Sequence, residues 1–364
     1  MAKVLLIGPL PPPVGGDTVS FNRLVHSKYW EKNDYEKTII NTSQKTEIKL
    51  TNRILGLKDF IKVINIMFSM LKKINNVDLV ILWGNSRFIY TAGLLIILIA
   101  KLFKKPITIK MFGGTFNDKF EKLPRIYKNI AIRIIKFVDI ITPETKFLCY
   151  YFINKLKFPK NKIHHLPNFI ASVKKEPFTI NKINKSNIKC VFIAQLKAEK
   201  GLFDVIDMLK SAGNVNCDFY GPILSRDQNK FLREIANIDN AKYKGIARHD
   251  EVCKIISQYD ILLLPTFHPG EGYPAVILEA FSTGTPVLAT KWKAIPEIVQ
   301  DLNNGFLVKP NSSNQILDKL LSILDKELYE KLCFNAQKTF QNNYTEEKIL
   351  GENYFKVIKT LIEN

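Results

Sequence analysis

Apolar residues along the chain fall into short runs that alternate with longer segments in which they recur at the spacing of one helical face. Most of the short runs end near glycine or proline and predict buried strands, whereas the longer segments predict amphipathic helices. The predicted strands are residues 4–7, 79–83, 107–111, 140–142, 191–194, 217–220, 261–264 and 287–289. Strands that alternate with helices form parallel sheets covered on both faces, so the pattern predicts an α/β fold.

Length and a change in composition predict two domains. A chain of 364 residues with 46% hydrophobic residues can bury two ordinary cores. A polar stretch rich in lysine and asparagine, within residues 167–187, marks the boundary between them. We therefore predict domains at residues 1–170 and 171–345, and a last amphipathic helix within residues 346–364.

The segment after the strand at 261–264 combines turn residues with a helix start. Pro274 suits the first helical position, so residues 275–281 should be helical. The first N–H groups of a helix have no partner within it, and the helix dipole places positive charge there. A phosphate or diphosphate site is therefore predicted at the N–H groups of Tyr273, Ala275 and Val276.

Two carboxylates flank this predicted site. Glu271 lies in the loop before it, and Glu279 follows 8 positions later in the helix. Carboxylates so placed suit a ligand with sugars on both sides of a diphosphate, which is a nucleotide sugar. The alternative is a loop acid and a helix-surface acid without a special role, since carboxylates are mostly exposed.

A second segment, residues 190–204, runs from an apolar strand through a basic loop into a helix that Gly201 opens. Lys200 is placed there to hold a diphosphate. The alternative is a solvated loop lysine, which is the usual state of this residue type.

The loop after the first strand, residues 9–16, ends in Gly15 and Gly16. These glycines allow the backbone to approach a ligand closely and to adopt a positive φ, and Asp17 or Thr18 should then cap a helix. A glycine pair is more often a turn than a ligand loop. The segment carries neither a Walker motif nor a dinucleotide fingerprint.

These segments resemble the retaining GT-B glycosyltransferases of family 4. The family's Glu-x7-Glu donor motif is matched by Glu271 and Glu279, with the intervening glycine–aromatic–proline step Gly272, Tyr273 and Pro274. Its Gly-Arg-Leu-x3-Lys-Gly motif is matched by Leu196, Lys200 and Gly201, while Ala194 and Gln195 replace the glycine and the arginine. Further matches are the turn at residues 284–287 and the helix start at residues 296–299.

The resemblance implies a GT-B fold, in which two doubly wound Rossmann-like domains face a central cleft. It places the acceptor side in residues 1–170 and the nucleotide sugar in residues 171–345, and the last helix crosses back to the first domain. It implies that Glu271 contacts the transferred sugar and Glu279 the ribose, with Glu271 and Lys200 as the catalytic residues. The other donor-binding residues that it implies are Gly15, Gly16, Gln195, Gly272, Tyr273, Ala275 and Val276.

Two departures from the family pattern bear on the ligand contacts. Because Gln195 lacks the charge of arginine, either Lys200 with the helix N–H groups suffices for the diphosphate or Lys197 contributes. Many family members carry a histidine near the sugar after the strand that corresponds to 107–111. Here that contact must come from the backbone of Gly113 or Gly114, or from the side chains of Thr115 or Lys110. His268, on the donor loop, is a weaker candidate for a ligand contact.

Charge is distributed unevenly along the chain. Residues 1–170 carry 28 lysines and arginines against 11 acidic residues, a net of +17, whereas residues 171–364 carry 25 against 23, a net of +2. Part of the positive charge lies in helical patterns with an apolar side, at residues 58–73 and 119–136. Basic amphipathic helices suit an anionic membrane surface. A solvated lysine-rich surface is one alternative, and nucleic acid is a weaker one because no recognised nucleic-acid motif accompanies the charge.

Several features that would indicate other classes are missing from the sequence. The five cysteines are scattered and read as reduced core residues of a cytoplasmic protein. No Asp-x-Asp motif or His/Cys cluster occurs, so we expect neither a metal nor another cofactor. We expect no signal peptide, and the uncharged stretch at residues 88–100 should be a buried helix because it is too short to span a membrane.

The predicted function is retaining transfer of a hexose from a nucleoside diphosphate sugar to an acceptor hydroxyl. We expect a lipid-linked acceptor, as in the assembly of a bacterial surface polysaccharide, and peripheral binding at the cytoplasmic face of the membrane. Two alternatives remain open. One is an enzyme of the same fold with a small soluble acceptor, and the other is a non-enzymatic binder of nucleotides or nucleic acid.

Overall fold

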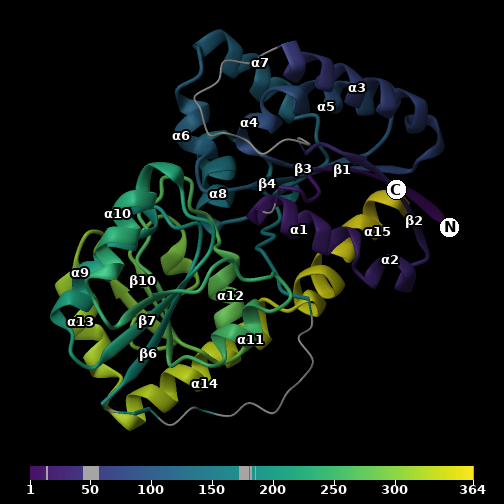
Figure 1. Ribbon diagram of the computed structural model, residues 1–364. Helices are drawn as coiled ribbons and strands as arrows, with labels where there is room; N and C mark the ends of the chain where they lie inside the picture. Colours follow the sequence, from purple (N-terminus) through teal and green to yellow (C-terminus); the bar gives the residue numbers. More distant parts are fainter. Residues whose placement is uncertain (14, 44–56, 172–179, 181–182, 185, 364) are drawn as a thin grey trace. The chain divides into compact units, whose positions relative to one another are not determined.

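The computed structural model describes residues 1–13, 15–43, 57–171, 180, 183–184 and 186–363 (Figure 1). The chain divides into two compact units: unit 1 is residues 1–171 with 346–364, and unit 2 is residues 172–345. The sequence places these boundaries at residues 170/171 and 345/346. Part of the predicted boundary stretch, residues 167–187, lies outside the described residues.

Unit 1 contains a five-stranded sheet in which all paired strands are parallel. In spatial order its strands are β2 (Tyr35–Asn41), β1 (Ala2–Gly8), β3 (Leu79–Asn85), β4 (Ile107–Phe112) and β5 (Ile140–Pro143). Successive side chains of a strand point to opposite faces, so Leu5 and Ile7 enter one core while Val4 and Leu6 enter another. Both faces of the sheet are therefore buried.

Helices from two parts of the chain cover these faces. On one face lie α3 (Leu57–Lys73), α4 (Ser86–Ile89), α5 (Ala92–Leu102), α6 (Phe116–Glu121), α7 (Arg125–Ile135), α8 (Lys146–Tyr150) and the π-helical turn η2 (Tyr151–Lys155). On the other lie α1 (Gly16–Val25), α2 (Tyr29–Lys32), the π-helical segment η6 (Glu347–Tyr354) and α15 (Phe355–Glu363). Short 3₁₀ turns are η1 (Ile74–Asn76) and η3 (Lys160–Lys162). The last helical segments thus belong to unit 1, where Trp83 and Phe355 lie in the same core.

Unit 2 contains a six-stranded sheet, also with parallel pairing throughout. In spatial order its strands are β11 (Gly305–Val308), β10 (Val287–Thr290), β9 (Ile261–Leu264), β6 (Ile188–Ile193), β7 (Val215–Tyr220) and β8 (Ala241–Tyr243). Its helices and 3₁₀ turns are η4 (Ala198–Lys200), α9 (Leu202–Ser211), α10 (Ser225–Ala236), α11 (Val252–Ile256), α12 (Ala275–Ser282), η5 (Ile295–Glu297), α13 (Ser313–Ser322) and α14 (Lys326–Asn343). Figure 1 shows α9, α10 and α13 on one side of this sheet and α11 and α12 on the other.

The eight strands that the sequence predicts are all present, and three more join them. The additional strands are β2, β8 and β11. β2 and β8 lie at sheet edges, where most of their side chains are half-buried or exposed, so they lack the continuous apolar run of a central strand. β11 is a run of four residues that starts with glycine, which weakens its strand pattern.

Candidate functional site

The order of strands in unit 2 reverses between two central neighbours, β6 and β9. From β6 the chain continues outward to β7 and β8, whereas from β9 it continues in the opposite direction to β10 and β11. In open parallel sheets, ligands bind beyond the carboxyl ends of the strands at such a reversal. The two loops that leave these ends, residues 194–201 and 265–274, are the two segments that the sequence predicts to bind a donor.

Backbone contacts hold these two loops together. Phe267 donates its N–H to the Glu199 carbonyl at 2.8 Å, and the Thr266 hydroxyl oxygen lies 3.2 Å from the same carbonyl oxygen. Gly201 has a φ of +77°, and a Cβ there would lie 2.3 Å from the Pro265 carbonyl oxygen. Only glycine fits this close approach of two backbones, which fixes Lys200 beside the second loop.

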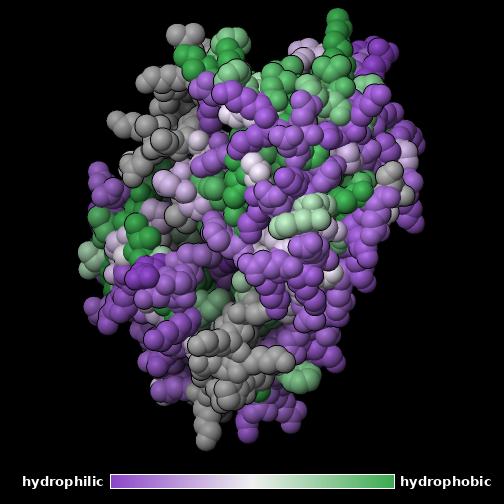
Figure 2. Space-filling view, turned by 90° about the vertical axis from the view of Figure 1, so that its right-hand side faces the viewer, coloured by the Kyte–Doolittle hydropathy of each residue, from purple (hydrophilic) through white to green (hydrophobic). Residues whose placement is uncertain are grey.

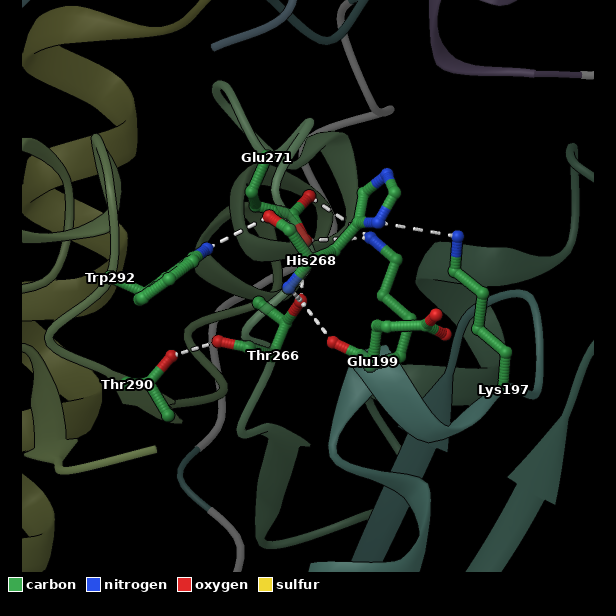
Figure 3. A network of polar contacts seen from close by, with 8 residues as sticks. Lys197, Glu199, Thr266, His268, Glu271, Thr290 and Trp292 are labelled. Atoms are coloured by element: carbon green, nitrogen blue, oxygen red, sulfur yellow. Dashed lines mark hydrogen bonds and ion pairs between the residues drawn. The ribbon is translucent and has the colours of Figure 1, made fainter. Parts of the chain in front are cut away.

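Lys200 and Glu271 form a buried ion pair at this junction (Figure 3). The Lys200 Nζ atom lies 2.7 Å from Glu271 Oε2 and 3.0 Å from Oε1. The Thr266 hydroxyl also donates to Glu271 Oε2, at 2.6 Å. The two residues that we predicted to be catalytic therefore lie side by side, and the carboxylate is held by an ammonium and a hydroxyl.

His268 lies next to this pair on the same loop. Its Nδ1 atom is 3.5 Å from Lys197 Nζ, and its backbone carbonyl accepts a hydrogen bond of 2.8 Å from Trp292 Nε1 (Figure 3). Burial, and then the charges of Lys197 and Lys200, lowers the pKa of His268 to about 4. The imidazole is therefore neutral near pH 7.

Glu279 is also buried but lies among other partners. It is in the second turn of α12, and its Oε1 atom is 3.9 Å from His249 Nδ1, a residue of the loop that follows β8. The two glutamates of the motif thus contact different groups, which agrees with separate roles.

The start of α12 differs slightly from the expectation. Pro274 is the residue before the first helical position rather than the first helical residue, and the helix begins at Ala275. Ala275 and Val276 nevertheless lie in the first turn, whose N–H groups precede the first intrahelical bonds. Gly272 lies in the loop beside Glu271. Tyr273 has a buried side chain that donates to Glu297 Oε2 at 2.7 Å, so its ring supports the loop from within.

Gln195 follows β6 directly and is half-exposed. Among the residues that the structure describes, its side chain has no hydrogen-bond partner.

The glycine pair of unit 1 is arranged differently from the expectation. Gly15 is the N-cap of α1 with an extended φ of −157°, and Gly16 is the first helical residue, so the predicted positive φ at these positions is wrong. The predicted caps Asp17 and Thr18 lie inside the first turn, where the Thr18 hydroxyl accepts a 2.9 Å hydrogen bond from the Gly15 N–H. A Cβ on Gly16 would meet nothing within 4 Å, so this helix start is open.

A buried polar network underlies the second glycine loop of unit 1. The Gly113 N–H donates to Glu144 Oε2 at 2.8 Å, and Asn168 Nδ2 donates to Glu144 Oε1 at 2.5 Å. Lys110 is fully buried and donates to the Leu166 carbonyl. Burial lowers the pKa of Lys110 to about 8, against the opposing effect of Glu144.

This network narrows the alternatives for a sugar contact from the loop. The Lys110 ammonium and the Gly113 N–H already have partners inside unit 1, so neither is presented to a ligand. Gly114 and Thr115 are half-exposed and remain available. Glu144 and Asn168 were not predicted because no motif surrounds them. For Glu144 the sequence signal is a charged residue two positions after the predicted strand 140–142.

No group of three or more histidine, cysteine, aspartate or glutamate side chains that could hold a metal ion occurs within the described ranges. The free cysteines are Cys149, Cys190, Cys217, Cys253 and Cys333, of which Cys190, Cys217 and Cys333 are buried.

Comparison with known proteins agrees with this geometry. The family model of the glycosyl transferases group 1 matches residues 173–340, which span the loops of Lys200 and Glu271. Residues 173–340 are thus similar to the glycosyl transferases group 1. The matched range covers nearly all of unit 2.

Individual relatives are distant. An N,N'-diacetylbacillosaminyl-diphospho-undecaprenol alpha-1,3-N-acetylgalactosaminyltransferase from Campylobacter jejuni is 23% identical, over 54% of this chain and 51% of its own length. An uncharacterized glycosyltransferase from Methanocaldococcus jannaschii is 26% identical over 43% of this chain and 44% of its own. The chain thus spans about half the length of these curated relatives.

Solved structures show the fold of the whole chain. Anabaena Alr3699/HepE in complex with UDP has a TM-score of 0.72 at 17% identity, with 100% of both chains covered. The same protein in complex with UDP-glucose has a TM-score of 0.70 at 16% identity, with 99% of this chain and 100% of that chain covered. The predicted GT-B fold of two Rossmann-like domains is confirmed.

Proposed function

We propose that the protein is a retaining glycosyltransferase that transfers a hexose from a nucleoside diphosphate sugar to an acceptor hydroxyl. The observation that carries this proposal is the buried Lys200–Glu271 pair at the strand reversal of unit 2. A group 1 family match over the same residues and the UDP-bound structural neighbour support a nucleotide-sugar donor.

In this proposal the site acts mainly through electrostatics. Lys200 and the first N–H groups of α12 stabilise the diphosphate as it leaves, and Glu271 holds the sugar while positive charge develops at its anomeric carbon. Glu279 accepts a hydrogen bond from the ribose. Retention of configuration rests on the family resemblance, and the leaving phosphate accepts the proton of the acceptor hydroxyl. We expect no metal to take part.

A panel of nucleoside diphosphate sugars tests the donor. The cognate donor should raise the melting temperature in proportion to the logarithm of its concentration over Kd, and a hydrolysis or transfer product should appear with that donor. Proton NMR of the product should show the anomeric configuration of the donor. Inversion would contradict the retaining mechanism, and loss of activity in EDTA that Mg²⁺ or Mn²⁺ restores would contradict the metal-free account.

We further propose that the acceptor is lipid-linked and that unit 1 binds the cytoplasmic face of an anionic membrane. The net charge of +17 in residues 1–170 is one support, and the outer surface of the helical layer is another. α5 lies between α3 and α7, and all three helices expose large apolar side chains. These are Phe60, Ile61, Ile64, Phe68 and Leu71 of α3, Leu95, Leu98 and Leu102 of α5, and Ile126 and Ile130 of α7.

Charged groups lie among these apolar side chains. Lys72 Nζ lies 4.3 Å above the ring of Phe68, and Arg125 and Arg133 are exposed on α7. The upper part of Figure 2, where α3 lies, shows hydrophobic and hydrophilic side chains interspersed. An apolar face with a basic rim suits partial insertion among anionic headgroups.

This layer also corrects one expectation. We predicted a buried helix at residues 88–100, and α5, which begins at Ala92, buries Leu94, Ile96 and Ile97 but exposes Leu95 and Leu98. Within the described residues, no helix is long and apolar enough to cross a membrane.

Sedimentation with liposomes tests the membrane proposal. The protein should bind phosphatidylglycerol vesicles at low salt and bind neutral vesicles less, and a Phe68→Glu/Ile126→Glu variant should lose most of this binding. Phe334→Glu is a matched control, since Phe334 is an equally exposed aromatic residue in unit 2. Equal binding to neutral and anionic vesicles, or no binding to either, would favour the alternative of a small soluble acceptor. Binding to nucleic acid instead of vesicles would indicate that the basic surface is a nucleic-acid site.

A further inference from the structure

Lys197 carries a charge that no acidic side chain neutralises. Its ammonium is half-buried in the loop after β6, and its hydrogen-bond partner is His268 Nδ1, at 3.5 Å. Within the described part of the chain, no carboxylate lies within ion-pair distance of Lys197 Nζ. Of the nearby acids, Glu271 pairs with Lys200, and Glu199 pairs with Arg226 through Oε1 while its Oε2 atom is buried without a hydrogen-bond partner.

This arrangement disfavours the charge of Lys197 in the absence of an anion. Burial, and then the neighbouring Lys200, lowers the pKa of Lys197, while Glu199 and Glu271 oppose this effect more weakly. A half-buried ammonium of this kind is stabilised when an anion binds beside it. The position is at the carboxyl end of β6, where the strand order of unit 2 reverses.

His268 is fixed in the orientation that receives Lys197. Its backbone N–H donates to the Thr266 hydroxyl at 3.1 Å, and its backbone carbonyl accepts from Trp292 Nε1. A Cβ on Gly270 would lie 2.9 Å from His268 Nε2, so the absence of a side chain there makes room for the imidazole. In Figure 3 the other ring nitrogen points away from Lys197.

We propose that Lys197 is a further donor-binding residue that contacts the diphosphate of the nucleotide sugar, and that His268 is the residue that positions it. The inference rests on the proposed function of the same site. Because His268 Nδ1 accepts from Lys197, its ring proton is on Nε2 and the imidazole adds no charge of its own. Lys200 is tied to Glu271, so Lys197 supplies the positive charge that is not already neutralised.

Calorimetric binding of UDP and of uridine to the full chain tests the role of Lys197. Lys197→Met should weaken UDP binding by about tenfold or more, the usual size of a charge-assisted contact, and leave uridine binding unchanged. Lys242→Met, which changes an exposed lysine on the edge strand β8, is the matched control and should bind UDP like the wild type. Unchanged UDP affinity in a folded Lys197→Met variant would overturn the inference.

A double-mutant cycle tests whether His268 acts through Lys197. His268→Ala should weaken UDP binding in the wild-type background and have no further effect in the Lys197→Met background. His268→Asn, whose amide oxygen replaces the Nδ1 acceptor, should recover most of the affinity. Equal losses in both backgrounds would mean that His268 does not position Lys197.

The outcomes also separate this inference from the proposed function. If UDP binding depends on Lys197 but no sugar is transferred from any donor, the inference stands and the enzymatic proposal fails. If transfer occurs and Lys197→Met binds UDP like the wild type, the enzymatic proposal stands and the inference fails. If the wild type binds no nucleoside diphosphate from a UDP, ADP and GDP panel, both fail.

Discussion

The two units share a parallel α/β plan but use their charged residues differently. In unit 2 an ammonium and a carboxylate meet where the strand order reverses, and residues 172–345 have 22 basic and 19 acidic residues, a net charge of only +3. In unit 1 Lys110 and Glu144 are both buried beneath a glycine loop, where Lys110 donates to the Leu166 carbonyl and Glu144 accepts from Gly113 and Asn168, and residues 1–170 have a net charge of +17. The same kind of sheet thus carries a polar loop junction in one unit and, in the other, a helical layer with exposed apolar and basic side chains.

The comparison shows that burial of charged side chains does not by itself identify a ligand site. Lys110 is completely buried and its bonds stay within the protein, whereas at the loop junction of unit 2 the Lys200 side chain is still 16% accessible and Lys197 is half-buried. Substitution of charged residues that a ligand can reach is expected to change binding. Substitution of fully buried charged residues is expected to change the stability of the fold. The following predictions separate these two cases.

The largest expected effect is on the stability of unit 1. Lys110→Met removes the hydrogen bond to the Leu166 carbonyl and the nearby positive charge from the buried Glu144 carboxylate, which should lower the free energy of unfolding by about 3–5 kcal/mol. Urea denaturation measures this change. UDP affinity of the folded fraction should be unaffected. Lys128→Met is the control: it removes a partly exposed pair with Glu121 and should cost less than about 1 kcal/mol. If Lys110→Met lowers the free energy of unfolding as little as the control does, the buried Lys110 ammonium does not stabilise unit 1.

The next effect concerns the ion pair of unit 2. Lys200→Ala should weaken diphosphate binding by about 1.5–3 kcal/mol, because it removes a charge-assisted contact, and should slow transfer. Calorimetry with UDP and an initial-rate assay measure the two quantities. A variant with full UDP affinity but lower stability would place Lys200 in the same structural class as Lys110.

The two glutamates should differ from each other. Glu271→Gln should lower turnover by at least about tenfold, roughly 1.4 kcal/mol, and leave UDP binding nearly unchanged, because in the proposed function Glu271 contacts the sugar. Glu279→Gln should instead weaken UDP binding, because in the same proposal Glu279 contacts the ribose. Steady-state kinetics with calorimetry distinguish them, and the assignment is wrong if both variants change UDP affinity alike and spare turnover at saturation.

The smallest effect is a dependence of stability on pH. Burial beside Lys197 and Lys200 lowers the pKa of His268 from 6.5 to about 4, with Glu271 and Glu199 opposing. Between these two pH values the unfolded chain binds more protons than the folded chain. The contribution of neutral His268 to the free energy of unfolding is therefore complete above about pH 6.5 and is lost as pH falls toward 4. Urea denaturation measures the free energy of unfolding at pH 7.5 and at pH 5. The difference between these two free energies should be smaller for His268→Asn than for the wild type. An identical difference would mean that His268 titrates normally.

Much of the fold followed from local patterns. Central strands such as β9 and β3 are continuous apolar runs because both of their faces are buried, and this signal is visible in the sequence. Edge strands such as β2 and β8 are partly solvated, so their patterns are weaker and were not predicted. The donor segments were predicted because turn residues and carboxylates recur there at a recognisable spacing.

The sequence by itself determined the α/β class, the two-domain plan, the resemblance at Lys200, Glu271 and Glu279, and the uneven charge. Only the tertiary structure decided that Lys200 pairs with Glu271, that His268 accepts a hydrogen bond from Lys197, and that Lys110 is fully buried near Glu144. The partners in these contacts are 71, 71 and 34 positions apart in the chain. Local propensity acts over a few residues, whereas these contacts depend on which strands are neighbours in a sheet, and that order is set by the packing of the whole unit.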